Sequence, residues 1–172
     1  MPSVAQSKIL KSKLHIVTME VFYTPSVRDS DVLTIAQEIE ILKSDLLADQ
    51  NIHLPVSQSS FFKNCHFKIT AGADHYGLAV ENENGEDVIC QCSIPYAVIK
   101  PILSDYLKIC DSYKSALKEG GQARLESIDM GRRGLHNDAA DQLISMLKPA
   151  MEIDFMTARH LFALLSTIHR SS

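Results

Sequence analysis

The sequence lacks an excess of basic residues. Lysine and arginine number 17 against 21 aspartates and glutamates, which gives a formal net charge of −4. Proteins that bind DNA or RNA usually carry an overall positive charge or a basic patch. Nucleic acid is therefore not an expected partner, and binding it would require a local patch.

The sequence also lacks a long apolar run. No stretch of about 18 apolar residues is present to span a bilayer, and the opening segment MPSVAQSKIL has no apolar core of a secretory signal peptide. Four cysteines in a chain of this size indicate reduced thiols and not a disulfide scaffold. We expect a cytoplasmic protein that does not enter a membrane.

Three common enzyme motifs are absent: the phosphate loop G-x-x-x-x-G-K, the elbow G-x-S-x-G and the metal-binding H-E-x-x-H. We expect no cofactor and assign no catalytic residue. Cys65, His66, Cys90 and Cys92 fall on expected strands, where residues i and i+2 lie roughly 7 Å apart on one face. Zinc usually takes paired ligands from a turn, so no metal site is expected, and Cys90, Cys92 and Cys110 are predicted to be core residues.

The length of 172 residues and a hydrophobic fraction of 45% are sufficient to bury a core. They predict a single domain over residues 1–172. Residues 1–13 contain Lys8, Lys11 and Lys13 and no acid, so we expect a flexible basic tail there.

The N-terminal half combines strand and helix patterns. A strand is predicted at 14–23, and a helix from Asp29 or Ser30 to about Asp49 follows, because its apolar residues recur at the helical period. Alternation of apolar and polar residues predicts three further strands, and the dipeptide Asn84-Gly85 predicts a tight hairpin between the last two. The expected result is an antiparallel meander, with strands at 61–70, 76–82 and 87–94.

The C-terminal half is helical in pattern. Pro101 is expected to open a helix that ends at Gly120-Gly121. Residues 122–148 are again helical in period, and a short extended piece at 151–153 leads to a last helix from Asp154 to about His169. Strands followed by helices, without regular alternation, predict an α+β fold in which an antiparallel sheet packs against about four helices.

The stretch IDMGRRGLHNDAADQL, residues 128–143, is the main candidate for a functional site. If residues 122–148 form one helix, their apolar residues form one stripe with the same phase before and after the glycines. Arg132 falls near the middle of that stripe, with Asp129 and His136 at its margin. Because an unpaired buried charge is costly, Asp129 is predicted to form a structural salt bridge with Arg132.

The two glycines of this stretch leave two alternatives open. Gly131 and Gly134 each cost roughly 1 kcal/mol in a helix interior relative to alanine, which predicts that something packs closely against them. Alternatively, Gly134 ends one helix and Asn137 caps the next, which would release Arg132 and Arg133 toward a ligand.

Three functions are consistent with these features. The first is a small regulatory or adaptor protein that acts through protein contacts or as a homo-oligomer, because the last helix is apolar over more than half of its circumference. The second is recognition of an anion or a phosphorylated metabolite by Arg132, Arg133 and His136, with Asn137 beside them, because arginine matches planar anions. The third is an enzyme that uses His136 with Asp129.

Three long motifs resemble a bacterial family known as uncharacterised protein family 0262. They lie within residues 101–170 and read DYLKICDSY, RLESIDMGRRGLHND and EIDFMTARHLFALLSTIH. The resemblance of the N-terminal half is limited to its order of strand, helix and antiparallel strands. The resemblance implies a bacterial cytoplasmic protein and no particular activity.

Overall fold

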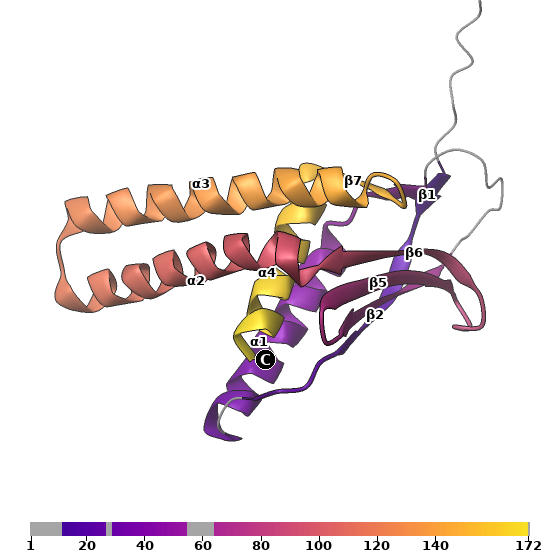
Figure 1. Ribbon diagram of the computed structural model, residues 1–172, viewed down its shortest axis with the longest axis horizontal. Helices are drawn as coiled ribbons and strands as arrows, with labels where there is room; N and C mark the ends of the chain where they lie inside the picture. The colour runs from indigo at the N-terminus through magenta and orange to yellow at the C-terminus, as the bar shows by residue number, and fades with distance from the viewer. Residues whose placement is uncertain (1–11, 27–28, 55–63, 172) are drawn as a thin grey trace, which may run out of the picture.

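The computed structural model describes residues 12–26, 29–54 and 64–171 (Figure 1). Within these ranges the chain forms four helices and seven strands, and its C-terminal half is helical, so the predicted α+β class is confirmed. The strands are β1 (Ser12–Leu14), β2 (Ile16–Phe22), β3 (Ile52–Leu54), β4 (Cys65–Ala71), β5 (His75–Asn82), β6 (Val88–Pro95) and β7 (Glu152–Ile153). The helices are α1 (Asp29–Ala48), α2 (Tyr96–Glu119), α3 (Gln122–Leu147) and α4 (Phe155–Ser171).

The larger sheet has the strand order β2-β4-β5-β6. β4 pairs antiparallel with β5, and β5 with β6, so the predicted meander is confirmed. In the turn between β5 and β6, Gly85 has a φ of 70° and its N–H donates to the carbonyl of Asn82. That φ favours glycine, in agreement with the hairpin expected at Asn84-Gly85. Residues 61–63 of the predicted strand at 61–70 lie outside the described ranges.

Strand β2 departs from the prediction. It runs parallel to β4, so the expectation of a wholly antiparallel sheet is wrong at this edge. Helix α1 lies between the two strands in the chain. A crossover of this length brings the chain back to the end of the sheet from which it left, and parallel pairing follows.

A second sheet, with the order β1-β3-β7, was not predicted. In it Lys13 lies opposite His53, and Ile52 lies opposite Ile153. The predicted tail at 1–13 is therefore wrong for its last two residues, which belong to β1, while residues 1–11 lie outside the described ranges. Each strand has only two or three residues, too few for a period-2 pattern to be recognised.

Helix α2 begins earlier than predicted. It starts at Tyr96, so Pro101 lies inside the helix, and Pro95 at the end of β6 is the residue that precedes it. Pro95 has an extended backbone, with φ −63° and ψ 136°. The backbone N–H of Tyr96 donates to the carbonyl of Asp74, and its hydroxyl donates to the carbonyl of Gly72. These two bonds fix the start of the helix at the sheet, so no loop separates β6 from α2.

Helix α4 lies at the centre of the helical layer, where it contacts α1, α2 and α3 (Figure 1). Its apolar side chains are buried inside the chain: Ala158, Leu161, Phe162, Leu164, Leu165 and Ile168. Of the apolar residues that suggested a homo-oligomer, Phe155 is the exposed one, at 38%. Intramolecular packing therefore accounts for the apolar character of this helix.

Helices α2 and α3 form an antiparallel hairpin that extends well beyond α1 and α4 (Figure 1). The end near the sheet packs on α4, whereas the far end has helical neighbours only within the hairpin. Between residues 111 and 133, all of which the structure describes, Ala116 alone is buried. The hairpin thus has a packed base and an exposed outer half.

Candidate functional site

The GRRGLHND stretch lies within one continuous helix. α3 runs from Gln122 to Leu147 without interruption at either glycine, so the alternative of two helices is excluded. Asn137 accordingly does not cap a helix.

Two arginines of this stretch share one carboxylate. The Nε and Nη2 atoms of Arg132 donate to Oδ1 of Asp129 at 3.1 and 2.7 Å. Nη2 of Arg133 lies 2.8 Å from Oδ2 of the same carboxylate. The hydrogen bonds from Arg132, helped by the charge of Arg133, lower the pKa of Asp129 below its usual value. The carboxylate therefore balances one of the two guanidinium charges, and the group formed by Asp129, Arg132 and Arg133 keeps one positive charge.

Arg132 also connects α3 to α2. Its Cζ lies 5.4 Å from the centre of the Tyr113 ring, and its guanidinium interacts with the hydroxyl of Tyr106. The side chain is 29% exposed, so it lies at the rim of the helix interface and not in the middle of a buried stripe, as the helical wheel had predicted. The side chain of Arg133 is 69% exposed.

His136 lies deeper in the same interface. It is 8% exposed, and its Nε2 lies 2.9 Å from the carbonyl oxygen of Arg159 in α4. Its ring centre lies 5.2 Å from that of Tyr106 and 5.5 Å from that of Phe162. Burial lowers the pKa of His136 below its ordinary value, so the ring is neutral at pH 7 and its Nε2–H donates to the carbonyl.

Asn137 completes the link between α3 and α4. Its side-chain Oδ1 accepts a hydrogen bond from Nη1 of Arg159. Arg159 in turn lies over the ring of Phe155, with 6.0 Å from its Cζ to the ring centre. Arg159 therefore holds two residues of the stretch. Its role could not be predicted from local spacing, because it lies 22 residues away from Asn137.

The two glycines have different surroundings. A Cβ added at Gly131 would lie 2.9 Å from Cδ1 of Ile109 in α2, so glycine allows close contact of the two helices. A Cβ added at Gly134 would meet no described atom within 4 Å. Within the described chain, a close contact is therefore found at Gly131 and not at Gly134.

The acid–base pair considered for catalysis does not form. Asp129 is occupied by Arg132 and Arg133, and His136 by the backbone of Arg159. Across the described ranges, no contact is found between the Asp129 carboxylate and the His136 ring. The four candidate ligand residues bind other parts of the protein and do not converge on an open space.

A pocket of about 340 Å³ lies where α1, α2 and α4 meet. Its polar wall contains an ion pair between Glu38 and Arg170, and the hydroxyl of Thr167 donates to the same carboxylate at 3.1 Å. Tyr106 and Cys110 form part of its α2 wall. The sequence could not indicate this site, because Glu38 and Arg170 are 132 positions apart and neither belongs to a motif.

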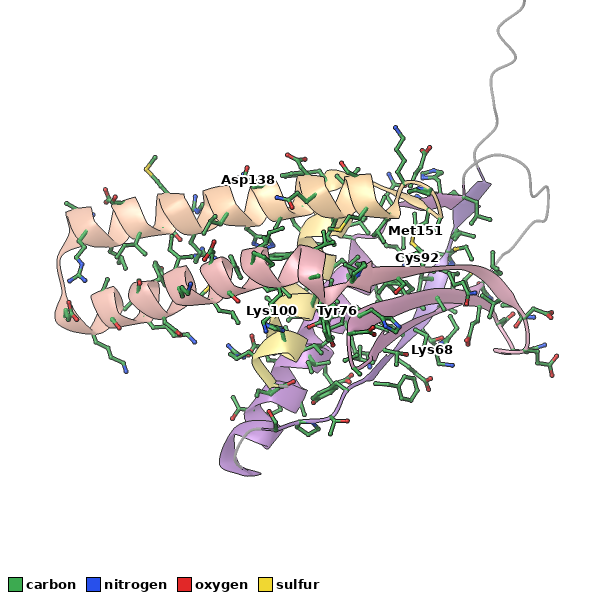
Figure 2. The ribbon with its side chains drawn as sticks, viewed as in Figure 1. Lys68, Tyr76, Cys92, Lys100, Asp138 and Met151 are labelled. Carbon is green, nitrogen blue, oxygen red and sulfur yellow. The ribbon has the colours of Figure 1, made fainter. Side chains whose placement is uncertain are left out.

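A second polar group, also missed, lies on the face of the larger sheet that no helix covers. Oγ1 of Thr18 is 2.6 Å from Nδ1 of His66, and Nε2 of that ring is 3.3 Å from the Glu20 carboxylate. Lys68, visible on the same side in Figure 2, pairs with Glu81 at 3.2 Å. These are neighbouring residues on paired strands, so the group is a ladder of cross-strand pairs.

The described part of the chain contains neither a cluster of metal ligands nor a membrane-spanning helix. Within 12–26, 29–54 and 64–171, no three His, Cys, Asp or Glu side chains are grouped to hold a metal ion. The four cysteines are free thiols, and burial raises the pKa of Cys90 and of Cys92 to about 11. In the described part of the chain, no helix has both the length and the apolar character required to cross a bilayer.

Comparison with known proteins identifies relatives of the chain. A UPF0262 protein of Azorhizobium caulinodans is 38% identical over 92 residues, which is 54% of this chain and 57% of that protein. A UPF0262 protein of Brucella anthropi is 40% identical over 92 residues with the same shares, and one of Chelativorans sp. is 36% identical over 102 residues, 59% and 63%. The matched part of the chain thus spans less than two thirds of each of these relatives.

No solved structure matches the chain. The family model described as uncharacterised protein family UPF0262 matches residues 15–171, which includes the three motifs in the C-terminal half and extends through the N-terminal half. The chain therefore belongs to the uncharacterised protein family UPF0262, as its motifs predicted.

Proposed function

We propose that the protein is a non-enzymatic adaptor or regulatory protein, and that it binds a helix of a partner protein along the outer face of α3. The contact surface is the stripe Ala123, Ser127, Met130 and Gly134. These residues follow the helical spacing i, i+4, i+7, i+11, so they share one side of the helix. All four are exposed.

The main support for this proposal is the presence of glycine at position 134. Glycine in a helix interior costs roughly 1 kcal/mol relative to alanine. At Gly131 the contact with Ile109 explains that cost, but at Gly134 no described atom lies within 4 Å and φ is not positive. A partner helix that approaches the backbone at Gly134 would account for the residue.

Met130 supports the same surface. The residue is 75% exposed, which is unusual for a large hydrophobic residue. Methionine adapts its shape to a partner and is common at protein-binding surfaces. Asp138, labelled on α3 in Figure 2 and four residues beyond Gly134, is also exposed.

The alternative of anion binding has less support. Among Arg132, Arg133 and His136, only Arg133 has a largely exposed side chain, and it already lies 2.8 Å from Asp129. A site for a phosphorylated metabolite usually offers several converging donors. We also infer a cytoplasmic location for the protein, on the basis that all four cysteines are free thiols.

Site-specific photo-crosslinking in living cells tests the adaptor proposal. A photoreactive benzoylphenylalanine replaces Met130 in one protein and Val88, an exposed residue of β6, in the control. We expect one discrete adduct from position 130 and none of the same mass from position 88. An adduct of twice the chain mass would identify the partner as a second copy.

Gly134→Leu then tests whether the adduct depends on close approach. Because this position faces solvent, the substitution leaves the folded protein intact, which circular dichroism checks, while its bulk blocks a partner helix. The adduct is expected to disappear. If the adduct persists unchanged in Gly134→Leu, or if position 130 yields none, this face of α3 is not the binding surface.

A further inference from the structure

We infer that the pocket between α1, α2 and α4 binds a small amphipathic carboxylate, with its apolar body among the three helices and its carboxylate between Lys114 and Arg170. This binding site is independent of the outer face of α3. Its lining comes from α1, α2 and α4 and includes no residue of α3.

The size of the pocket suits a small molecule. Its volume of about 340 Å³ is near the lower end of the range for ligand pockets, about 300–1,000 Å³. One wall comes from each of three helices, so a ligand would be enclosed from several directions. A long peptide or a large cofactor would not fit this volume.

The inner surface is suited to an apolar body. Leu42 of α1, Leu107 of α2 and Ala163 of α4 contribute aliphatic side chains to the lining. Ser166 also lines the pocket, and its hydroxyl already donates to the carbonyl of Ala163 at 2.8 Å. The wall therefore offers an apolar ligand few unsatisfied polar groups, which limits the desolvation cost of binding.

Two basic side chains at the pocket, Arg170 and Lys114, can donate to a ligand. Both oxygens of Glu38 are engaged, one by Thr167 and the other by Nη2 of Arg170. Arginine has five N–H groups, so Arg170 retains donors for a ligand. Lys114 forms no ion pair with any residue that the structure describes, and its ammonium group is available.

Asp111, one turn before Lys114, is the competing charge, and it also has no ion pair among the residues in the described ranges. Burial raises the pKa of the Cys110 thiol in the pocket wall, while a hydrogen bond with Tyr106 and the positive charges of Arg132 and Lys114 act to lower it. The pocket lining therefore holds two donors, Lys114 and Arg170, against one unpaired acid, Asp111. A single negative charge fits it, whereas a phosphate dianion would place a second negative charge beside Glu38 and Asp111.

Titration of the isotopically labelled full chain with hexanoate, followed by ¹H–¹⁵N correlation NMR, tests this inference. Hexanol and hexylamine are matched probes, because they have the same apolar chain with no charge or with a positive charge. We expect saturable shifts of the amides of residues 107–114 and 163–170. The affinity for hexanol should be about tenfold lower, the loss expected for one charge-assisted hydrogen bond.

Lys114→Met removes the ammonium group and keeps most of the side-chain length. It should weaken hexanoate binding about tenfold and leave hexanol binding unchanged. Lys118→Met, one turn further along the same exposed helix, is the control and should bind hexanoate as the unmodified chain does. The inference is wrong if hexanoate gives no saturable shifts at the pocket, if hexanol or hexylamine binds as tightly, or if Lys114→Met binds hexanoate normally.

Discussion

On the inner face of α3, Gly131 lies beneath Ile109 of α2 and His136 lies between Tyr106 and Phe162. On the outer face, Gly134 and Met130 have no such neighbours. The two faces contain the same kinds of residue, glycine and a bulky side chain, within a few positions of one another. Contacts within the chain account for these residues on the inner face but not on the outer face.

Two different kinds of interaction hold the inner face in place. Near the base, His136 and Asn137 connect α3 to α4 through Arg159. One turn earlier in α3, Arg132 connects α3 to α2 through Tyr113 and Tyr106. The stretch that resembled an anion site is, in this structure, the part of α3 that positions the hairpin on the body of the protein.

The largest difference between the faces should appear when an inner side chain is truncated. Leu143 is fully buried on the inner face, and Leu143→Ala should lower the free energy of unfolding by about 2–5 kcal/mol, because it removes apolar contacts and leaves a cavity. Met130→Ala on the outer face should change it by no more than about 0.5 kcal/mol. Urea unfolding of both variants measures the contrast, and similar losses would mean that the outer face is also packed.

Replacement of Asp129, at the rim of the inner face, is expected to lower the stability by an intermediate amount. Its folded-state pKa is lowered, so the carboxylate stabilises the protein at pH values above its unfolded pKa, about 3.9, and this contribution is lost as the pH falls through the folded pKa. Asp129→Asn should therefore be less stable than the unmodified chain at pH 7. The difference should become smaller below about pH 4.

Thermal unfolding of both proteins from pH 3 to pH 8 measures this dependence. Glu126→Gln is a suitable control, because Glu126 lies on the same helix, one turn before Met130, and is exposed. Its stability relative to the unmodified chain should vary less with pH. If the stability difference between Asp129→Asn and the unmodified chain stayed constant down to pH 3, the shared carboxylate would not act through its charge.

Periodicity and spacing allowed much of the inner face to be predicted. The constant phase of apolar residues on both sides of the glycines indicated one helix, and the i, i+3 spacing placed Asp129 within reach of Arg132. Both are local relations along α3, where the geometry of the helix fixes which side chains are neighbours. The antiparallel meander could be predicted for the same reason, since tight turns connect neighbouring strands.

Relations between distant segments could not be predicted. The parallel pairing of β2 depends on the path of α1, and the small sheet joins residues as far apart as Ser12 and Ile153. The pocket depends on Glu38, Tyr106 and Arg170 from three helices. In each case the partner is set by tertiary packing, which a single sequence does not display.

Replacement of the two glycines should give the smallest changes in stability. It is also the most direct comparison of the two faces. Gly134→Ala should raise the free energy of unfolding by about 1 kcal/mol, because alanine has the higher helix propensity and its methyl group meets nothing. Gly131→Ala should gain less or lose stability, because its methyl group would lie 2.9 Å from Cδ1 of Ile109 unless that side chain rotates. Gly131→Ala combined with Ile109→Val removes the obstructing methyl and should restore part of the helix-propensity gain. Chemical denaturation of the three variants measures these differences, and equal stabilities of the two single variants would mean that neither glycine is required for packing within the chain.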